Sequence, residues 1–331
     1  VQAPREYSDK YSGVYDEGWS VLREKRRQAA IAAGVIPAEA RAGVTPGTAE
    51  WDSLTAEQKR YDTRRMEVYA GMVDAMDENI GRLMSYLKSI DEYDNTIFIF
   101  TSDNGAASTP LMDSDGNSPL KGWFDTVGYN TDYETLGEKG SWVAIGPGNA
   151  SVAGSPLLYY KFHANEGGLR VPLVISGPGI ARRGELTDEF TFVTDLAPTI
   201  LSLTGIDDHQ GSHNGQVVEP IVGSNFAEYL GVSAEKIHLD SEPVGYELGG
   251  SSVLFKGDYK IVINRFEQNE SEWHLYNIKS DPGETKDLMN ELPDLFAEML
   301  LDYEVWEEAN DVLPMPEGYN RGRAIFRGGF N

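Results

Sequence analysis

The chain has 331 residues, of which 40% are hydrophobic and 24% are charged, and these values are ordinary for a globular protein. Its 53 acidic and 28 basic residues give a net charge of −25, which argues against nucleic acid or an anionic membrane surface as a partner, because both require a basic footprint. The absence of cysteine excludes disulfides, thiolate metal sites and cysteine nucleophiles together, and no stretch approaches the roughly 20 apolar residues of a membrane span.

The first predicted elements are two helices separated by a linker. Val14–Ala33 is amphipathic and stops at Gly34, and residues 35–54 have the Pro, Gly and Thr content of a surface linker. Thr55-Ala56-Glu57-Gln58 matches a capping box and predicts the start of the second helix. Apolar residues then recur at spacings of three and four, which predicts one stripe packed on a larger body: Met66, Tyr69, Val73, Met76, Ile80, Leu83, Leu87 and Ile90. A coiled coil is the alternative, but the strand that follows favours a crossover helix.

A short apolar run without polar alternation, Thr96–Thr101, predicts a strand buried on both faces. A long helix, a tight turn and a buried strand make half of a parallel βαβ unit. Residues 105–160 show little periodicity, and so long a connection inside a compact protein usually builds the wall of a site. Val171–Ser176 predicts a second buried strand, and Thr194–Leu203 predicts a short helix ended by Gly205.

The pattern changes after about residue 235, where hairpin chemistry appears at Gly257-Asp258. The sequence therefore predicts an α/β fold in two parts. Residues 1–235 would form a mostly parallel sheet flanked by helices, and residues 236–331 a small antiparallel sheet with a packed helix. The elements predicted for the second part are strands at Ser252–Lys256, Tyr259–Asn264 and Trp273–Ile278 and a helix at Leu292–Glu308.

The most informative short segment directly follows the first predicted strand and ends in Asp103-Asn104-Gly105. Ligands of open α/β sheets collect beyond the carboxyl ends of the strands. Asp103 and Asn104 offer two adjacent hard oxygen donors of the kind that Ca²⁺ or Mg²⁺ prefers. Gly105 would let the backbone turn away and leave room for a bound group. An Asx turn is the alternative, and on this segment alone it is the more common outcome.

A second candidate is Lys161, which lies shortly before Glu166-Gly167-Gly168. A lysine at a cleft supplies a compact positive charge suited to an oxyanion, and two glycines allow close backbone approach. Such a lysine by itself is most often an ordinary surface residue. The neighbouring His163 is interpreted as a satisfied or exposed histidine without a catalytic role.

In combination, these segments resemble a known family. In chain order they are Met66–Leu83 with Asn95–Gly105, Tyr160-Lys161 with Glu166–Pro172, Thr194–Thr199, Trp273–Ile278 and Asp281–Leu288. They resemble the type I, formylglycine-dependent sulfatases, including the bacterial arylsulfatases, of the alkaline phosphatase superfamily, and the chain resembles the C-terminal portion of that family.

The resemblance implies an alkaline-phosphatase-like sheet and calcium-dependent hydrolysis of a small-molecule sulfate ester. It implies that Asp103 and Asn104 are calcium ligands, which reverses the preference for a plain turn. It implies that Lys161 contacts the sulfate and helps to stabilise charge on the ester oxygen. Asp195 matches a recurrent position of the family, and we interpret its role as capping the helix that follows.

One departure from the family concerns the nucleophile. The motif from which formylglycine forms, Cys or Ser followed by x-Pro/Ala-x-Arg, does not occur, and the Asp-Asp pair at the end of the family's first strand, which gives the other two calcium ligands, is missing as well. Both belong to the N-terminal part of the family. Two protein ligands fall short of the about six to eight oxygens that Ca²⁺ prefers, so we expect the chain alone to be inactive.

We therefore expect the chain to be a fragment that a missing N-terminal segment or a second chain completes. Such a partner would cover apolar surface on the sheet and on the long helix, and a homo-oligomer is the other way to cover it. Two alternative functions stay open: a noncatalytic binding protein that keeps the sulfatase fold, and a related phosphodiesterase or phosphonate hydrolase. Family habit implies a periplasmic or secreted protein, with the cytoplasm as the alternative.

Overall fold

The computed structural model describes residues 2–46, 48–108, 126–206, 211–265 and 272–316. The helices are α1 (Arg5–Ser8), α2 (Trp19–Ala32), α3 (Ala56–Ser89), α5 (Gly146–Ala153), α6 (Glu166–Leu169), α7 (Leu196–Thr204), α8 (Ala227–Leu230) and α9 (Pro293–Ala309). The strands are β1 (Phe98–Thr101), β2 (Leu173–Ser176), β3 (Ser212–His213), β4 (Gln216–Val217), β5 (Pro243–Leu248), β6 (Ser251–Lys256), β7 (Tyr259–Asn264) and β8 (His274–Asn277).

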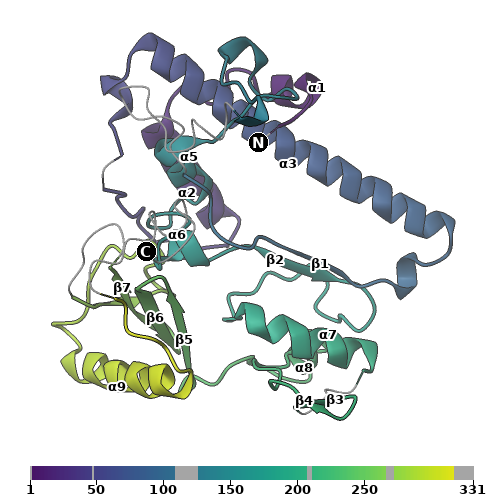
Figure 1. Ribbon diagram of the computed structural model, residues 1–331, viewed down its shortest axis with the longest axis vertical. Helices are drawn as coiled ribbons and strands as arrows, with labels where there is room; N and C mark the ends of the chain where they lie inside the picture. The colour runs from purple at the N-terminus through teal and green to yellow at the C-terminus, as the bar shows by residue number, and fades with distance from the viewer. Residues whose placement is uncertain (1, 47, 109–125, 207–210, 266–271, 317–331) are drawn as a thin grey trace.

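These elements form three groups around the pair β1–β2 (Figure 1). Helices α1, α2, α3 and α5 make the first group, α7 and α8 with the β3–β4 hairpin make the second, and the sheet β5–β8 with α9 makes the third. The short helix α6 lies between the first group and the third. No helix in the described ranges is long and apolar enough to cross a membrane.

Helix α3 begins as the sequence predicts. The Gln58 amide donates to Thr55 Oγ1 at 3.2 Å, and the Thr55 amide donates to Gln58 Oε1 at 2.9 Å, so the capping box is formed. Helix α2 starts at Trp19, five residues later than predicted, because Gly18 has a positive φ of 81° and cannot continue a helix.

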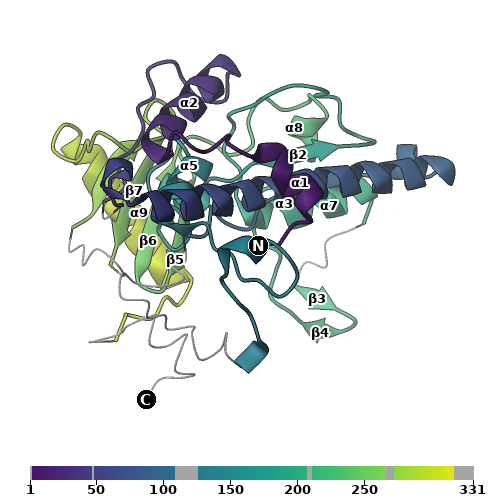
Figure 2. The ribbon, with the colours of Figure 1, turned by 90° about the horizontal axis from the view of Figure 1, so that it is seen from above.

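The apolar stripe of α3 packs over only part of its length. Met66 is fully buried among Tyr15, Trp19 and Trp51. Beyond Gly71 the stripe is largely solvent-exposed, at Val73, Met76, Leu83 and Ile90. Figure 2 shows the end of α3 extending past the neighbouring elements. The prediction of one continuous packed stripe therefore holds for the first turns of the helix and is wrong for the later ones in this chain.

Strands β1 and β2 pair antiparallel, with Thr101 opposite Leu173. The predicted parallel arrangement is therefore not formed by these two strands. The reason lies in the connection, because the Gly105 amide donates to the Gly168 carbonyl at 2.9 Å. This bond fixes the segment before β2 at the carboxyl end of β1, so β2 must run back along β1 instead of starting from its far end.

The prediction that β1 is buried on both faces is wrong for this chain. Phe100 on β1 is 37% exposed and Val174 on β2 is 57% exposed. Strand β1 pairs with β2 alone, so both edges of the pair are open and one of its faces is uncovered. Apolar side chains on that face are therefore exposed to solvent.

The C-terminal sheet has the strand order β5-β6-β7-β8, with every neighbouring pair antiparallel. Gly257 has a φ of +55° in the β6–β7 turn, which suits the predicted Gly257-Asp258 hairpin. Met299 and Tyr303 of α9 are buried against Leu254, Ile261 and Leu275 of the sheet. The α/β class and the C-terminal antiparallel sheet with a packed helix are confirmed, and the boundary at residues 235 and 236 stays a prediction.

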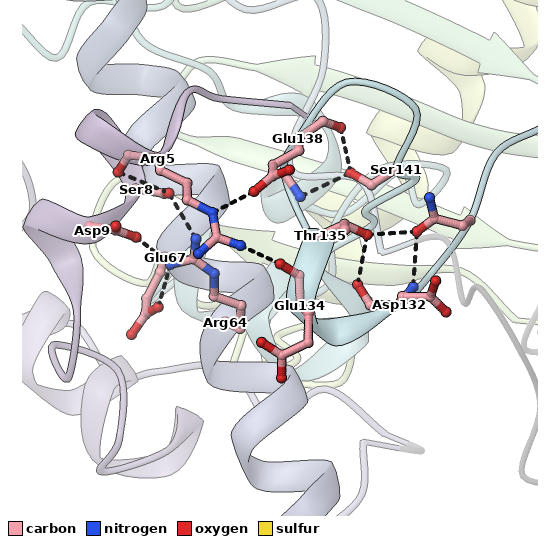
Figure 3. A network of polar contacts seen from close by, with 12 residues as sticks. Arg5, Ser8, Asp9, Arg64, Glu67, Asp132, Glu134, Thr135, Glu138 and Ser141 are labelled. Atoms are coloured by element: carbon pink, nitrogen blue, oxygen red, sulfur yellow. Dashed lines mark hydrogen bonds and ion pairs between the residues drawn. The ribbon is translucent and has the colours of Figure 1, made fainter.

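Polar contacts hold the N-terminal helix α1 against α3 (Figure 3). Arg64 of α3 donates to Ser8 Oγ at 3.0 Å and pairs with Glu67 at 3.0 Å, and Arg5 pairs with Glu138. A polar hollow of about 360 Å³ lies among these side chains. Arg64 pairs there with both Asp9 and Glu67, and the three predicted site residues are not among those that line the hollow.

Candidate active site

The Asp103–Asn104 loop leaves the carboxyl end of β1. Asp103 is exposed, and within the described ranges its carboxylate has no hydrogen-bond or ion-pair partner. The Asn104 amide nitrogen donates to the Gly105 carbonyl at 2.8 Å, so its side-chain oxygen is the atom left to accept or coordinate. The loop therefore presents one carboxylate and one amide oxygen on neighbouring residues.

The structure brings Lys161 to this loop. The Lys161 amide donates to the Ala106 carbonyl at 3.0 Å, and the Gly105 amide donates to the Gly168 carbonyl at 2.9 Å. The half-buried Lys161 ammonium lies 5.5 Å from the centroid of the Phe162 ring, and no carboxylate of the described residues pairs with it. All three predicted site residues thus lie on two segments that are joined backbone to backbone.

Three glycines make this junction close. A Cβ on Gly105 would lie 1.8 Å from the Gly167 carbonyl oxygen, one on Gly167 would lie 2.2 Å from the Tyr159 oxygen, and one on Gly168 would lie 2.0 Å from the His163 oxygen. The room beside Gly105 is therefore filled by backbone, not left for a bound group as the sequence suggested. Tyr159 and Phe162 have positive φ values of 61° and 81° on either side of Lys161, which is uncommon for such residues.

His163 is buried and stacks on Tyr159, with ring centroids 4.1 Å apart, and its Nδ1 lies 3.1 Å from the Tyr160 carbonyl oxygen. The ring is therefore buried and held by its neighbours, and the interpretation of a histidine without a catalytic role stays a prediction.

The predicted capping role of Asp195 holds only in part. Its carboxylate makes no cap for α7 itself, but it accepts a hydrogen bond from the Phe192 amide at 2.7 Å and so caps the 3-10 turn Val193–Asp195 that leads into α7. It also accepts a hydrogen bond from the Ser224 amide at 2.7 Å and lies 2.8 Å from His238 Nε2. A fully buried carboxylate requires several donors, and these come from segments on both sides of α7, so Asp195 joins these segments in addition to capping the turn.

A cluster that the sequence did not reveal lies beneath the site. Lys260 of β7 is completely buried, and its Nζ lies 3.0 Å from Glu166 Oε1 and 2.9 Å from Glu284 Oε1. Burial opposes ionisation of Glu166, but Lys260 and Arg170 outweigh it and lower the pKa of Glu166. Burial raises the pKa of Glu284, and the charge of Lys260 offsets this increase only in part. The one sequence signal was a lone lysine in the apolar run Tyr259–Asn264.

The oxygen ligands that the Asp103–Asn104 loop offers are of the type that a hard cation prefers, but there are too few of them. A free carboxylate and an amide oxygen are typical calcium ligands. Among the residues that the structure describes, no group of three or more His, Asp or Glu side chains could hold a metal ion. Asp103 and Asn104 could therefore contribute to a calcium site but would not complete one.

Comparison with known proteins shows which family the chain belongs to. The sulfatase family model matches residues 1–206, and the model of the N-sulphoglucosamine sulphohydrolase C-terminal region matches residues 157–299. The fold and the matched segments define an α/β protein of the sulfatase type. The chain belongs to the sulfatase family.

Two curated relatives extend the comparison. An uncharacterized sulfatase of Schizosaccharomyces pombe is 36% identical over 326 residues, which cover 96% of this chain and 57% of that protein. An arylsulfatase of Klebsiella aerogenes is 34% identical over 224 residues, which cover 67% of this chain and 47% of that protein. The chain thus spans about half the length of these curated relatives.

Among solved structures, one of a protein in complex with its substrate D-glucosamine-2-N,6-O-disulfate has a TM-score of 0.52 at 23% identity. The match covers 80% of this chain and 45% of that one. It shows the shared fold.

Proposed function

We propose that this chain supplies part of the metal and sulfate site of an enzyme that hydrolyses sulfate esters in a calcium-dependent reaction. The observation that carries the proposal is the backbone junction between the Asp103–Asn104 loop and Lys161, through two hydrogen bonds of 2.9 and 3.0 Å. It sets a free carboxylate, an amide oxygen and an ammonium group on adjoining segments. Membership in the sulfatase family and the 34% identity to an arylsulfatase support the same reaction class.

In this proposal, Asp103 and Asn104 hold the calcium ion, and Lys161 faces the sulfate or the leaving ester oxygen. The bound ion would supply a Lewis acid that neutralises sulfate charge. An ammonium group placed where negative charge develops stabilises that charge most when no carboxylate competes for it, and Lys161 meets this condition among the described residues. The remaining calcium ligands and the formylglycine nucleophile would come from an N-terminal segment or a second chain.

The test is a sulfate-ester assay on the full-length protein. We expect Lys161→Ala to lower kcat/KM by about 10²- to 10³-fold, because one charge that stabilises the transition state is removed. Asp103→Ala and calcium chelation should each abolish most of the activity, and added Ca²⁺ should restore the chelated sample. Lys139→Ala is the control, because Lys139 is an exposed lysine outside the site. Full activity in the Lys161→Ala protein, or indifference to chelator, would contradict the proposal.

The same assay decides the noncatalytic alternative. A full-length protein that binds a sulfate ester without releasing sulfate, with or without Ca²⁺, is the result that this alternative predicts.

A partner surface forms a further part of the proposal. The surface consists of large apolar residues of α3 and of β1–β2 that are exposed in this chain: Val73, Met76, Leu83, Ile90, Phe100 and Val174. In the intact enzyme, the N-terminal segment or a second chain would cover this face. In the isolated chain, a second copy would cover it.

We therefore expect the isolated 331-residue chain to scatter light as a dimer or larger species. Met76→Glu combined with Leu83→Glu should shift it toward the monomer, because charges on α3 prevent burial of the face. Val217→Glu, at a residue 95% exposed on β4, should change nothing. A monomer at all concentrations that also fails to bind a dye for exposed apolar surface would refute this expectation.

A further inference from the structure

The cluster beneath the site joins the C-terminal sheet to α6 through charged groups. Lys260 projects from β7 between Glu166, the first residue of α6, and Glu284, in the loop after β8. The exposed fractions of these three side chains are 0%, 3% and 0%. Glu284 also accepts a hydrogen bond from the Glu166 amide at 2.9 Å, so the backbone of α6 is part of the cluster.

A second polar side chain on the same face of β7 holds the residues before α6. Asn264 lies four residues beyond Lys260, and alternate residues of a strand share a face. Its Oδ1 accepts from the Ala164 amide at 2.7 Å, and its Nδ2 donates to Asn165 Oδ1 at 2.6 Å. Val262, between them on this face, packs against Ala164. Strand β7 therefore contacts residues 164–166 through a continuous row of side chains.

The opposite ends of this short segment carry the candidate site. Gly168, two residues after Glu166, accepts the hydrogen bond from Gly105, and Lys161, five residues before Glu166, donates to Ala106. Helix α6 has only one turn, and an isolated turn of that length does not hold its own position. Whatever fixes α6 thus fixes both Lys161 and the Asp103–Asn104 loop.

We propose that Lys260 is a positioning residue for this site: it acts through Glu166 and Glu284 to set α6, and through α6 it places Lys161 against the Asp103–Asn104 loop. This role rests on the proposed sulfate-ester hydrolysis and adds a residue from the C-terminal sheet to it. Lys260 itself touches neither the loop nor Lys161 in the contacts of the described residues.

Charge alone does not account for the cluster. A buried ion pair seldom adds net stability over apolar residues of similar volume, because the desolvation of its charges offsets their attraction. The cluster instead fixes the positions of Glu166 and Glu284, because Lys260 can satisfy its donors only when both carboxylates lie within hydrogen-bond distance. Replacing the pair without leaving a lone charge should therefore spare the stability and loosen the geometry.

The decisive variant is Lys260→Met combined with Glu284→Gln. It removes one charge of each sign, keeps an acceptor for the Glu166 amide, and breaks the link from β7 to α6. The matched control is Lys256→Met combined with Asp302→Asn. Lys256 is likewise a lysine of the same sheet that contacts two carboxylates, at 2.5 and 2.6 Å, but both belong to α9.

The first measurement is amide hydrogen exchange of Gly105 and Lys161 in the 331-residue chain, which needs no activity. We expect exchange at least about tenfold faster in the decisive variant and unchanged in the control, with melting temperatures close to that of the unsubstituted chain in both. In the full-length protein with Ca²⁺, kcat/KM should fall by at least about tenfold in the decisive variant alone, because small displacements of positioned groups are costly.

Unchanged exchange at Gly105 and Lys161 would overturn the positioning role, whatever the activity. A full-length unsubstituted protein that hydrolyses no sulfate ester would instead overturn the proposed function, and the exchange result would still decide whether Lys260 positions the loop. Should the decisive variant not fold, Lys260→Arg serves as the second variant. It keeps the charge of Lys260 and alters the hydrogen-bond geometry. The positioning role predicts faster amide exchange at Gly105 and Lys161 in this variant as well, whereas a charge pair that only stabilises the fold predicts unchanged exchange.

Discussion

Gly105→Ala is expected to destabilise the protein by about 3 kcal/mol or more, because overpacking a site that cannot move is among the more costly core changes. The new methyl group would lie 1.8 Å from the Gly167 carbonyl oxygen and 2.9 Å from its carbonyl carbon. Both are backbone atoms, and Gly167 is itself held because its amide donates to the Leu158 carbonyl at 2.8 Å. The loop and α6 would have to separate.

That separation would break the two backbone hydrogen bonds between the segments, so the loss should extend to the site. We expect the sulfate-ester hydrolysis proposed for the full-length protein to fall by at least about 10²-fold in Gly105→Ala. Urea unfolding of the chain measures the stability, and the assay measures the site.

Gly81→Ala is the matched control. Gly81 lies within α3, and a Cβ there meets no atom within 4 Å. Because alanine favours a helix more than glycine does, this change should stabilise the chain by about 0.5 to 1 kcal/mol. A Gly105→Ala protein as stable as the Gly81→Ala protein would show that the junction between the loop and α6 is not closely packed.

How far the sequence predicts the fold depends on whether the signal is local. The capping box at Thr55 and Gln58, the glycine at residue 205 and the hairpin at Gly257-Asp258 each depend on neighbouring residues, and the structure has all three. The antiparallel pairing of β1 with β2 depends on the contact between Gly168 and the loop after β1, which are far apart in sequence. No local pattern encodes that contact, so the order of helix, turn and strand predicted a parallel sheet instead.

The residues of the candidate site also differ in whether their signal in the sequence is local. Asp103, Asn104 and Lys161 could be predicted because each belongs to a short motif, and the structure sets them on adjoining segments. The partners of Glu166 lie 94 and 118 residues away in the chain, and although Glu284 belongs to the segment Asp281–Leu288, no pattern in that segment points to Glu166. Asp195 was assigned to the nearest helix for want of such information, whereas its actual partners include His238, 43 residues away.

Asp195→Ala is expected to destabilise the chain by about 3 to 5 kcal/mol. The change leaves two partly buried backbone donors, at Phe192 and Ser224, without their acceptor and removes the anion beside His238. Each buried donor left without a partner costs about 1 to 3 kcal/mol, and breaking a buried charge pair adds to this. Asp188→Ala is the control, because Asp188 is largely exposed and, among the described residues, forms an ion pair with Lys279 alone, at 3.7 Å. The stability of this control should lie within about 0.5 kcal/mol of that of the unsubstituted chain.

The same substitution should change how stability depends on pH. Burial opposes protonation of His238, but its hydrogen bond to Asp195, with the charges of Asp195 and Glu242, outweighs burial and raises the pKa of His238 above its usual value of 6.5. The other groups that face the ring are Ser224 and the Phe190 ring, and neither is charged near neutral pH. A histidine whose pKa is higher in the folded state stabilises that state fully below its unfolded pKa, and this contribution is lost as the pH rises through the folded pKa.

Urea unfolding at a series of pH values from about 5 to 9 should therefore show the unsubstituted chain losing part of its stability above pH 6.5, where unfolded histidine gives up its proton. The Asp195→Ala chain should lose less over the same interval, because Glu242 alone then favours the charged ring, from 3.2 Å at its Nδ1. An NMR titration of the His238 ring should show a lower pKa in the variant. Equal slopes in the two chains, with the ring titrating at the same pH, would mean that Asp195 holds Phe192 and Ser224 alone and that the His238 contact contributes no stability.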